Sequence, residues 1–553
     1  MIQENFIETI AASINKHWDV PCFSDLEGET ITYGEVARRI FKIHYIIAEA
    51  GLKKGDRIGL AGRNCANWCV AYLAAVTCGA VIVPILPDFT SGEIEHIIRH
   101  SACKLLFTAD TIHDRLDEDK MPSLDGIFHL EDFSLGWAGE KKLTKVVEGA
   151  DAGYHDRYGA LLDGREIRFP KISNADLAAI VYTSGTTGFS KGVMLTGNSL
   201  IANIMYFLQS IDLTPGDNVV SFLPLAHAFG CSFDFLAPMA AGCHVTYVEK
   251  IPTPKVLVAA FEKYRPVYVM SVPLVIEKIY RNRIKPVLET NKIKLMLKVP
   301  GLNKVVYKKI HDQIYEVFGG RFKEMVIGGA AINRDIEDFF RKIGLRMTCG
   351  YGMTECGPLI SYTVFDGTPP VGSVGRIIPY LEGRIHDPHP ETGIGEVQVR
   401  GENLMLGYYN DEEATAETIN PEGWLMTGDL GRLDENGFLF LTGRSKNMIL
   451  TASGQNVYPE EIESQLNNLP CVEESLVLEN EGKLVALVYP DLESVDRACL
   501  KGKQVESLME ENRRNLNVRL PGFSQIARLK VLYEEFEKTP TKKIKRRLYD
   551  AFS

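Results

Sequence analysis

The sequence predicts an α/β fold, with a large N-terminal domain of layered α/β subdomains and a small α+β C-terminal domain. Helical and strand-like patterns alternate over roughly the first four hundred residues, as they do where helices cover strands. The chain then becomes glycine-rich and strand-like between Val371 and Arg444. The last hundred or so residues return to a mixed pattern, and a segment of that size can form an independent domain.

Hydrophobic periodicity predicts the first elements. Thr32 is placed to cap a helix, because the apolar residues after it recur three or four positions apart from Val36 to Ile47. The alternation that follows predicts helices at 67–77 and from Ser91 onward, and strands at 57–61, 80–85 and 104–108.

The middle and C-terminal parts continue this pattern. Residues 267–272 form a nearly continuous apolar run, which is typical of a strand covered on both faces, and residues 280–319 are expected to be helical. Other expected helices are 255–264, 336–343, 460–469 and one that ends over 513–518; other expected strands are 177–181, 325–327 and the hairpin of 475–478 with 484–489.

Composition is that of an ordinary globular chain. The 553 residues are 45% hydrophobic, and no apolar run approaches the eighteen or so residues that span a bilayer, so no transmembrane helix is expected. The N-terminus lacks the regions of a secretory signal, which favours a cytoplasmic location. A net charge of −11 argues against nucleic acid as a partner. The eleven cysteines are scattered without a CxxC pair, which supports neither a disulfide framework nor a zinc ribbon.

Residues 182–192 form the most informative segment. Glycines allow backbone N–H groups to approach phosphate oxygens, hydroxyls add donors, and a lysine supplies positive charge. The spacing is not that of a Walker A loop, and the pattern by itself is also compatible with a mobile surface loop. The residues that suit a phosphate are Thr183, Ser184, Gly185, Thr186, Thr187, Gly188 and Lys191.

This segment resembles the signature phosphate loop of the adenylate-forming superfamily, which includes acyl-CoA synthetases, adenylation domains of peptide synthetases and luciferases. One departure is Ser190, which stands where the family usually has proline. Further motifs follow in the family's order, so the resemblance covers essentially the whole chain. It implies the family's fold, in which the small C-terminal domain is mobile.

The resemblance implies an adenine pocket. The small residues at 328–331 are similar to the turn that borders the adenine and acyl pockets, which makes Gly329 and Ala330 nucleotide contacts. Tyr351 and Gly352 open a second motif, in which the aromatic ring lies against adenine. Adenine suits such an apolar face.

The second motif continues to Thr354 and Glu355. The resemblance implies that the Thr354 hydroxyl meets the α-phosphate and that Glu355 holds Mg²⁺, a hard cation that prefers oxygen ligands. Taken alone, residues 351–355 are also a turn followed by a helix start, with Thr354 as an ordinary cap.

Segments near the expected domain boundary resemble the family's ribose site, hinge and thiol tunnel. Asp429 and Arg444 correspond to the ribose-binding pair, and a carboxylate can accept two hydrogen bonds from a diol. Lys446 aligns with the hinge and Gly454 with the glycine that lines the pantetheine tunnel. The predicted division is therefore 1–443 for the AMP-binding and acyl-binding domain, 444–446 for the hinge and 447–553 for the C-terminal domain.

The terminal segment 539–546 aligns with the family's mobile catalytic loop. Lys543 falls on the lysine that bridges the substrate carboxylate and the α-phosphate, and Lys542, which replaces a common glycine, is the second choice. Without the family, residues 542–547 are a basic cluster, which is more often a solvated face or a membrane-surface patch than a catalyst. That interpretation suggests peripheral contact with the inner membrane surface.

The implied function is ATP-dependent activation of a fatty acid. The carboxylate attacks the α-phosphorus of MgATP to give acyl-AMP and pyrophosphate, and coenzyme A then takes the acyl group. His227 lies in a segment that resembles the one near the acyl carboxylate, although a lone histidine is usually structural. Residues 269–319 and the terminal motif resemble long-chain fatty acyl-CoA synthetases, which implies an apolar pocket.

Other functions stay open at this point. The acceptor could be the thiol of an acyl carrier protein, and the acid could be medium-chain or aryl. A non-catalytic acyl- or nucleotide-binding regulator is a third hypothesis, against which the intact Lys191, Glu355 and Lys543 speak. A membrane-bound scaffold that uses the basic tail is the fourth. Oligomeric state is not predicted.

Overall fold

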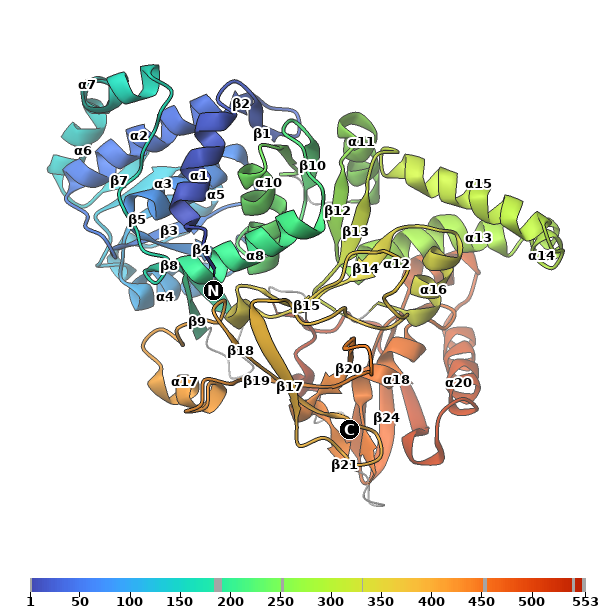
Figure 1. Cartoon of the computed structure of the whole chain (residues 1–553). Coiled ribbons are helices and arrows are strands. Elements are labelled where there is room, and N and C mark those ends of the chain that lie inside the picture. Colours follow the sequence, from blue (N-terminus) through green and yellow to red (C-terminus); the bar gives the residue numbers. More distant parts are fainter. Residues whose placement is uncertain are drawn as a thin grey trace.

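A seven-stranded sheet organises the N-terminal part of the chain (Figure 1). The computed structural model describes residues 2–183, 191–249, 253–330, 332–450, 455–539 and 543–549. The strand order is β7-β6-β5-β3-β4-β8-β9, in which the inner strands run parallel and the edge strands β7 and β9 are antiparallel to their neighbours. The strands are β3 (Arg57–Ala61), β4 (Val81–Ile85), β5 (Cys103–Thr108), β6 (Gly126–His129), β7 (Leu135–Ala138), β8 (Leu177–Thr183) and β9 (Lys191–Thr196).

The cap of α2, the first long helix beside this sheet, lies where the sequence predicts it. Thr32 caps α2 in a capping box with Glu35, and Gly51 ends that helix in the left-handed conformation with φ 88°. Thr90 and Glu93 form the same box at the start of α4. The helices are α1 (Phe6–Lys16), α2 (Tyr33–Ala50), α3 (Ala66–Cys78), α4 (Ser91–Ser101), α5 (Asp110–His113), α6 (Lys141–Glu148), α7 (Ala150–Asp163) and α8 (Gly197–Ser210).

A second sheet has the order β10-β11-β1-β2, in which β10, β11 and β1 are parallel. It packs into the same hydrophobic core as the seven-stranded sheet, and that core runs from Phe6 to Leu425. Its strands are β1 (Pro21–Asp25), β2 (Thr30–Thr32), β10 (Asn218–Ser221) and β11 (His244–Tyr247), and the helices around it are α9 (Ala228–Gly230), the π-helix η2 (Cys231–Leu236), α10 (Ala237–Ala240) and α11 (Pro254–Tyr264).

Three parallel strands, β12 (Tyr268–Ser271), β13 (Glu324–Ile327) and β14 (Met347–Cys349), bring three loops together. At their carboxyl ends the Gly328 amide donates to the Ser271 carbonyl at 3.0 Å, and the Gly350 amide donates to the Ile327 carbonyl at 2.8 Å. The segments that follow these strands are therefore neighbours, and two of them carry residues of the predicted site. Helix α16 (Arg334–Lys342) links β13 to β14.

Residues 280–319 are not one helical stretch, and this expectation was wrong in detail. Pro286 lies in the first turn of α13, and Gly301 follows Pro300 with φ 90°, a backbone conformation that does not continue a helix. Figure 1 shows the resulting pieces projecting at the right-hand edge of the molecule. They are α12 (Pro273–Ile279), the π-helix η3 (Tyr280–Ile284), α13 (Lys285–Leu288), α14 (Asn291–Leu297) and α15 (Leu302–Val317).

The glycine-rich region forms an antiparallel sheet with the order β17-β18-β19-β20. Its strands β19 and β20 place Asp429 directly opposite Arg444. The strands are β17 (Leu381–His386), β18 (Gly395–Gly401), β19 (Leu425–Leu433) and β20 (Leu439–Arg444), with α17 (Glu412–Thr418) beside them; shorter pairs are β15 (Tyr351–Gly352) with β16 (Leu359–Ser361) and β21 (Ile449–Leu450) with β22 (Asn456–Val457).

The C-terminal part packs around hydrophobic clusters separate from the main core, one of them formed by residues between Val457 and Ile526. Its sheet has the order β23-β24-β25. None of the described helices is both long and apolar enough to cross a bilayer. The elements are α18 (Pro459–Leu466), β23 (Val472–Asn480), β24 (Lys483–Pro490), α19 (Leu492–Arg497), α20 (Lys503–Asn517) and β25 (Ile526–Val531).

Candidate active site

The segment after β15 forms a short 3₁₀ turn, Thr354–Cys356, that holds a buried carboxylate. The Tyr408 hydroxyl donates to Glu355 Oε1 at 2.8 Å. Lys191 Nζ lies 4.8 Å from the centroid of the Tyr408 ring, within cation–π range. Tyr408 therefore joins two residues that the sequence predicts to contact phosphate and metal. Tyr408 itself was not predicted.

Two buried asparagines fix this turn. Asn203 Nδ2 donates to the Gly357 carbonyl at 2.7 Å, and its Oδ1 accepts from the Leu359 amide at 2.9 Å. Asn403 Nδ2 donates to the Cys356 carbonyl at 2.8 Å. Because the turn is irregular, these side chains replace the hydrogen bonds that a helix or strand would supply.

Gly352 is required by close packing of the backbone in the same motif. A Cβ at this position would lie 2.1 Å from the Pro358 carbonyl oxygen, which no side chain tolerates. The Met353 amide donates to that carbonyl at 2.9 Å, so the two ends of the turn are held in contact. The turn thus has one defined shape.

Tyr351, Asp429 and Arg444 form a polar cluster beside the turn. The Tyr351 hydroxyl donates to Asp429 Oδ2 at 2.6 Å, and Arg444 Nε lies 3.0 Å from Asp429 Oδ1. Burial raises the pKa of Asp429, and Arg444 and the tyrosine hydroxyl oppose that shift. Each carboxylate oxygen keeps a further lone pair, so Asp429 retains the capacity to accept from a diol.

Lys543 reaches this cluster from the C-terminal part of the chain. Its amide donates to Thr539 Oγ1 at 3.2 Å, and the Thr539 amide donates to its carbonyl at 2.8 Å, which holds the two residues together. Part of the Lys543 side chain is exposed. The pKa of its ammonium group is nevertheless lowered, first by the surrounding protein and then by the positive charge of Arg444. The negative charges of Asp429 and Glu355 act in the opposite direction. The predicted catalytic lysine is thus close to these three charged groups.

His227 lies at the same site, at the N-cap of α9. Burial lowers the pKa of its imidazole to about 4, and the positive charge of Lys543 acts in the same direction. The neighbouring Phe229 ring packs against Gly328, where a Cβ would come within 2.8 Å of it. The segment with His227 therefore lies against the loop after β13.

Residues 10–409 of this chain match the model of a protein family that is described as "AMP-binding enzyme". The chain belongs to the AMP-binding enzyme family. The resemblance of the motifs to the adenylate-forming superfamily is thereby confirmed.

Similarity to other proteins covers most of the length of this AMP-binding enzyme. The chain is 27% identical to "Long-chain-fatty-acid--CoA ligase FadD15" of Mycobacterium bovis, over 94% of this chain and 90% of the relative. It is 28% identical to "4-coumarate--CoA ligase CCL1" of Humulus lupulus, over 84% of this chain and 80% of the relative. The crystal structure of ATP-bound MatB from Rhodopseudomonas palustris superposes with a TM-score of 0.75 over 99% of this chain and 100% of that one, at 24% identity, which confirms the fold.

The phosphate loop of the AMP-binding enzyme is only partly described. Thr183 ends β8 and pairs with Lys191, the first residue of β9, across a hairpin. The strand β9 was not predicted from the sequence, and it is followed directly by α8. Residues 184–188, and Gly454 of the predicted thiol tunnel, lie outside the described residues, so their assignments stay predictions.

The small-residue turn after β13 is described up to its third residue. Gly329 has φ 86°, in the region that favours glycine, and Ala330 is exposed beside it. Both follow the carboxyl end of β13, next to the segment that carries Tyr351. This position suits the predicted nucleotide contacts.

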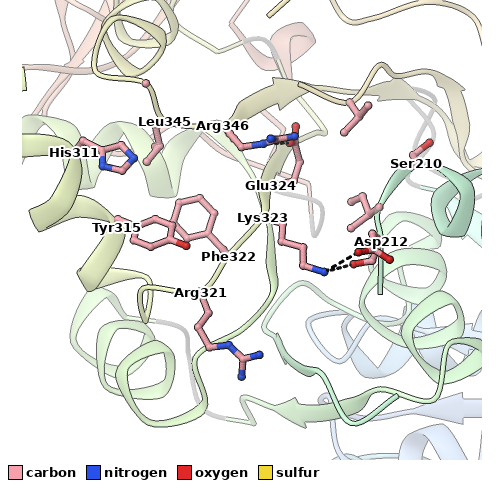
Figure 2. Close-up of a pocket in the computed structure, with 13 residues that line it drawn as sticks. Ser210, Asp212, His311, Tyr315, Arg321, Phe322, Lys323, Glu324, Leu345 and Arg346 are labelled. Atoms are coloured by element: carbon pink, nitrogen blue, oxygen red, sulfur yellow. Dashed lines mark hydrogen bonds and ion pairs between the residues drawn. The ribbon is translucent and has the colours of Figure 1, made fainter. Parts of the chain in front are cut away.

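A separate cavity of about 510 Å³ lies at the opposite ends of β13 and β14 (Figure 2). Lys323 Nζ donates to the Asp212 carbonyl at 2.6 Å, and the buried Glu324 accepts from Thr348 Oγ1 at 2.8 Å. Arg346 Nε lies 3.5 Å from the other Glu324 oxygen. None of the predicted site residues lines this cavity, and its charged groups are paired, Lys323 with Asp212, Arg346 with Glu324, and Arg321 with Asp217 outside the lining.

We expect His227 to remain neutral at physiological pH and to titrate near pH 4. The unfolded chain binds this proton near pH 6.5, so between about pH 6.5 and pH 4 the unfolded state holds more protons and the free energy of unfolding falls as pH is lowered. The buried His44, whose pKa is also lowered to about 4, acts in the same sense and removes about 2 kcal/mol between pH 7 and pH 5. Nitrogen-15 NMR of the histidines, with His227→Gln for assignment, measures both values. A His227 resonance that titrates near pH 6.5 would contradict this expectation.

Proposed function

We propose that this AMP-binding enzyme is a long-chain fatty acid–CoA ligase that forms acyl-AMP from ATP and transfers the acyl group to coenzyme A. One observation carries the proposal. Lys543, from the end of the chain, lies within electrostatic range of Glu355, Asp429 and Arg444. A protein that only binds nucleotide or acid has no need of a lysine delivered to this point.

The residues divide into nucleotide-binding and charge-stabilising groups. Tyr351 supplies the ring against adenine, Asp429 and Arg444 accept and donate at the ribose, and Lys191 approaches the outer phosphates from β9. The contacts that Tyr351, Asp429, Arg444 and Lys191 make in the structure hold their side chains in place. Little reorganisation is therefore needed when the nucleotide binds.

Glu355 fits the role of metal ligand. Its Oε1 accepts from Tyr408, while its Oε2 has no hydrogen bond within the described part of the chain and is available to a cation. A carboxylate oxygen is the donor that Mg²⁺ prefers. When held there, Mg²⁺ would offset the negative charge of the phosphates. Thr354, next to it, offers a hydroxyl to the α-phosphate.

In the first step, the acid carboxylate attacks the α-phosphorus and pyrophosphate leaves. Two anions must approach each other, so neutralisation of charge and positioning dominate the catalysis. The Lys543 ammonium group is placed to stabilise both the carboxylate and the α-phosphate. His227, neutral because its pKa is about 4, adds no second positive charge and can orient the carboxylate by a hydrogen bond.

In the second step, a thiol attacks the mixed anhydride and AMP leaves. We propose the division at residues 444–446, so that the C-terminal domain turns about Lys446 and withdraws Lys543.

Gly454→Leu is expected to slow thioester formation at least tenfold more than it slows adenylation, because a side chain would narrow the thiol tunnel. Single-turnover rates for the two half-reactions measure this ratio. Equal loss in both steps would remove the tunnel assignment.

The proposal of a long-chain substrate is supported by similarity to the relative from Mycobacterium bovis and by the acyl-site motifs at 269–280. The relative from Humulus lupulus is a ligase for an aryl acid, so aryl and medium-chain acids form the second candidate. The alternative acceptor is an acyl carrier protein, which presents the same pantetheine thiol.

A pyrophosphate-release assay over a set of acids tests the proposal. The set includes saturated fatty acids from short to long chain and 4-coumarate, each with and without coenzyme A. The proposal expects the highest kcat/KM for long-chain acids and product release that depends on coenzyme A. Preference for 4-coumarate would establish the aryl alternative, and turnover only with acyl carrier protein would establish the other acceptor. No turnover with any acid would favour a non-catalytic regulator.

A further inference from the structure

A lysine-rich projection, residues 285–309, stands at the edge of the molecule. It comprises α13, α14 and the first half of α15, at the right of Figure 1 and on the opposite side from α6. It contains seven lysines and a single acidic residue, Glu289, whereas the whole chain has a net charge of −11. The local charge is therefore opposite to that of the protein as a whole.

The lysines of the projection are free to meet a partner. Six are exposed and Lys285 is half-buried. None of the seven forms an ion pair within the described ranges. A solvated helix face normally carries acidic residues three or four positions from its lysines, and here only Glu289 is present. The residues are Lys285, Lys292, Lys294, Lys298, Lys304, Lys308 and Lys309.

Large apolar side chains are exposed among these lysines. Leu295 is 67% exposed and Val305 is 60% exposed. On α15, Val306 and Ile310 pack into the core, so Leu302 and Val305 are not needed to anchor the helix. Five of the exposed large hydrophobic residues in the described chain fall in this short segment, namely Val287, Leu295, Val299, Leu302 and Val305.

Exposed leucine and valine interleaved with unpaired lysine is the pattern of a surface that lies in a membrane interface. The apolar side chains enter the headgroup region, and the lysines face anionic headgroups. An acidic protein partner would bind the lysines but would not require exposed apolar side chains among them. A purely solvated face would require neither feature.

Three residues of the basic C-terminal cluster, for which membrane contact was also predicted, are engaged elsewhere. Lys543 faces the candidate active site. Arg546 pairs with Glu463, and Lys545 lies 3.9 Å from Glu537. Arg547 and the neighbouring Leu548 are exposed, but the larger group of unpaired cations and exposed apolar side chains in the described chain lies in the projection.

We propose that residues 285–309 form a binding site for an anionic lipid bilayer. Lipid binding requires neither ATP nor an acid, so it is independent of the proposed function. If the substrate is a fatty acid, the surface places the enzyme where that substrate partitions. The projection is also continuous through α12 with Val272, which packs beside Gly329 at the candidate active site.

Vesicle co-sedimentation of the full chain tests the proposal. The vesicles are phosphatidylcholine alone, or phosphatidylcholine with about 30% phosphatidylglycerol, at about 0.1 M and 0.5 M salt. The wild-type protein should bind the anionic vesicles and should release at high salt. Lys292→Gln, Lys294→Gln and Lys298→Gln together should weaken binding about a hundredfold, because each lysine near an anionic surface contributes about fivefold. Leu295→Ser with Val305→Ser should weaken it about tenfold.

The matched control replaces three lysines on α6, Lys141, Lys142 and Lys145, with glutamine, and the apolar control is Val518→Ser at a position that is 86% exposed. Both controls should bind like wild type, and thermal unfolding should show that every variant is folded. Equal binding to neutral and anionic vesicles overturns the proposal, as does equal loss in the α6 control. If the lysine changes abolish vesicle binding but the apolar changes have no effect, the projection binds the bilayer through charge alone, and the insertion of Leu295 and Val305 is wrong.

Discussion

Lys543→Ala is expected to slow acyl-adenylate formation by about 10²–10³-fold or more, with little change in affinity for ATP. In the proposed mechanism the lysine stabilises the charge that develops between the carboxylate and the α-phosphate, whereas Tyr351, Asp429 and Arg444, which contact one another, bind the nucleotide. Exchange of labelled pyrophosphate into ATP measures the first quantity, and calorimetric titration with a non-hydrolysable ATP analogue measures the second.

Lys545→Ala is the matched control for this prediction. It removes a lysine two positions away whose side chain is half exposed and loosely paired with Glu537. Exposed pairs of this kind contribute little, so adenylation should be near the wild-type rate. Unchanged adenylation in Lys543→Ala would mean that another group bridges the substrates, and Lys542→Ala would be the next variant to test.

Asp429→Ala is expected to weaken binding of AMP about a hundredfold. The carboxylate is placed to accept hydrogen bonds from the ribose, and hydrogen bonds to a charged group contribute about 1.5–3 kcal/mol each. The change also leaves Arg444 and the Tyr351 hydroxyl without their shared partner. Calorimetric titration with AMP gives the dissociation constant, and thermal unfolding shows whether the variant is folded.

Tyr351→Phe separates the two contributions to that loss. It keeps the ring that we propose to face adenine and removes only the hydroxyl that donates to Asp429. Affinity for AMP should fall less than about tenfold, the value of one hydrogen bond. An Asp429→Ala variant with wild-type affinity would refute the ribose assignment. A Tyr351→Phe variant as weak as Asp429→Ala would show that the pair organises the site and that the direct sugar contact is minor.

Local signals predicted much of the fold. The strand at 57–61 and the cap at Thr32 are found as expected, because apolar runs bounded by polar residues and a capping box depend on neighbouring residues only. The strand β9 was missed because it directly follows a glycine-rich loop and pairs with β8 across a hairpin. The breaks at Pro286 and Gly301 were missed because the helical apolar spacing continues on both sides of them.

Short sequence motifs located the candidate site, but they did not indicate which residues contact it from distant parts of the chain. Thr354 and Glu355 stand in one recognisable string, whereas Tyr408, Asn203 and Asn403 contact that string from distant parts of the chain. Nothing in the residues around Tyr408 indicates that its hydroxyl meets a carboxylate. Only the folded chain brings such residues together.

The C-terminal domain is held against the segment after β12 by a few polar contacts. Arg281 donates to the Asn467 and Val472 carbonyls at 2.6 and 3.2 Å, and Lys278 Nζ lies 3.0 Å from Glu473. Contacts of this kind contribute about 1 kcal/mol each, so breaking them adds only a small barrier. The proposed reorientation of the C-terminal domain between the two steps therefore meets little resistance from these contacts.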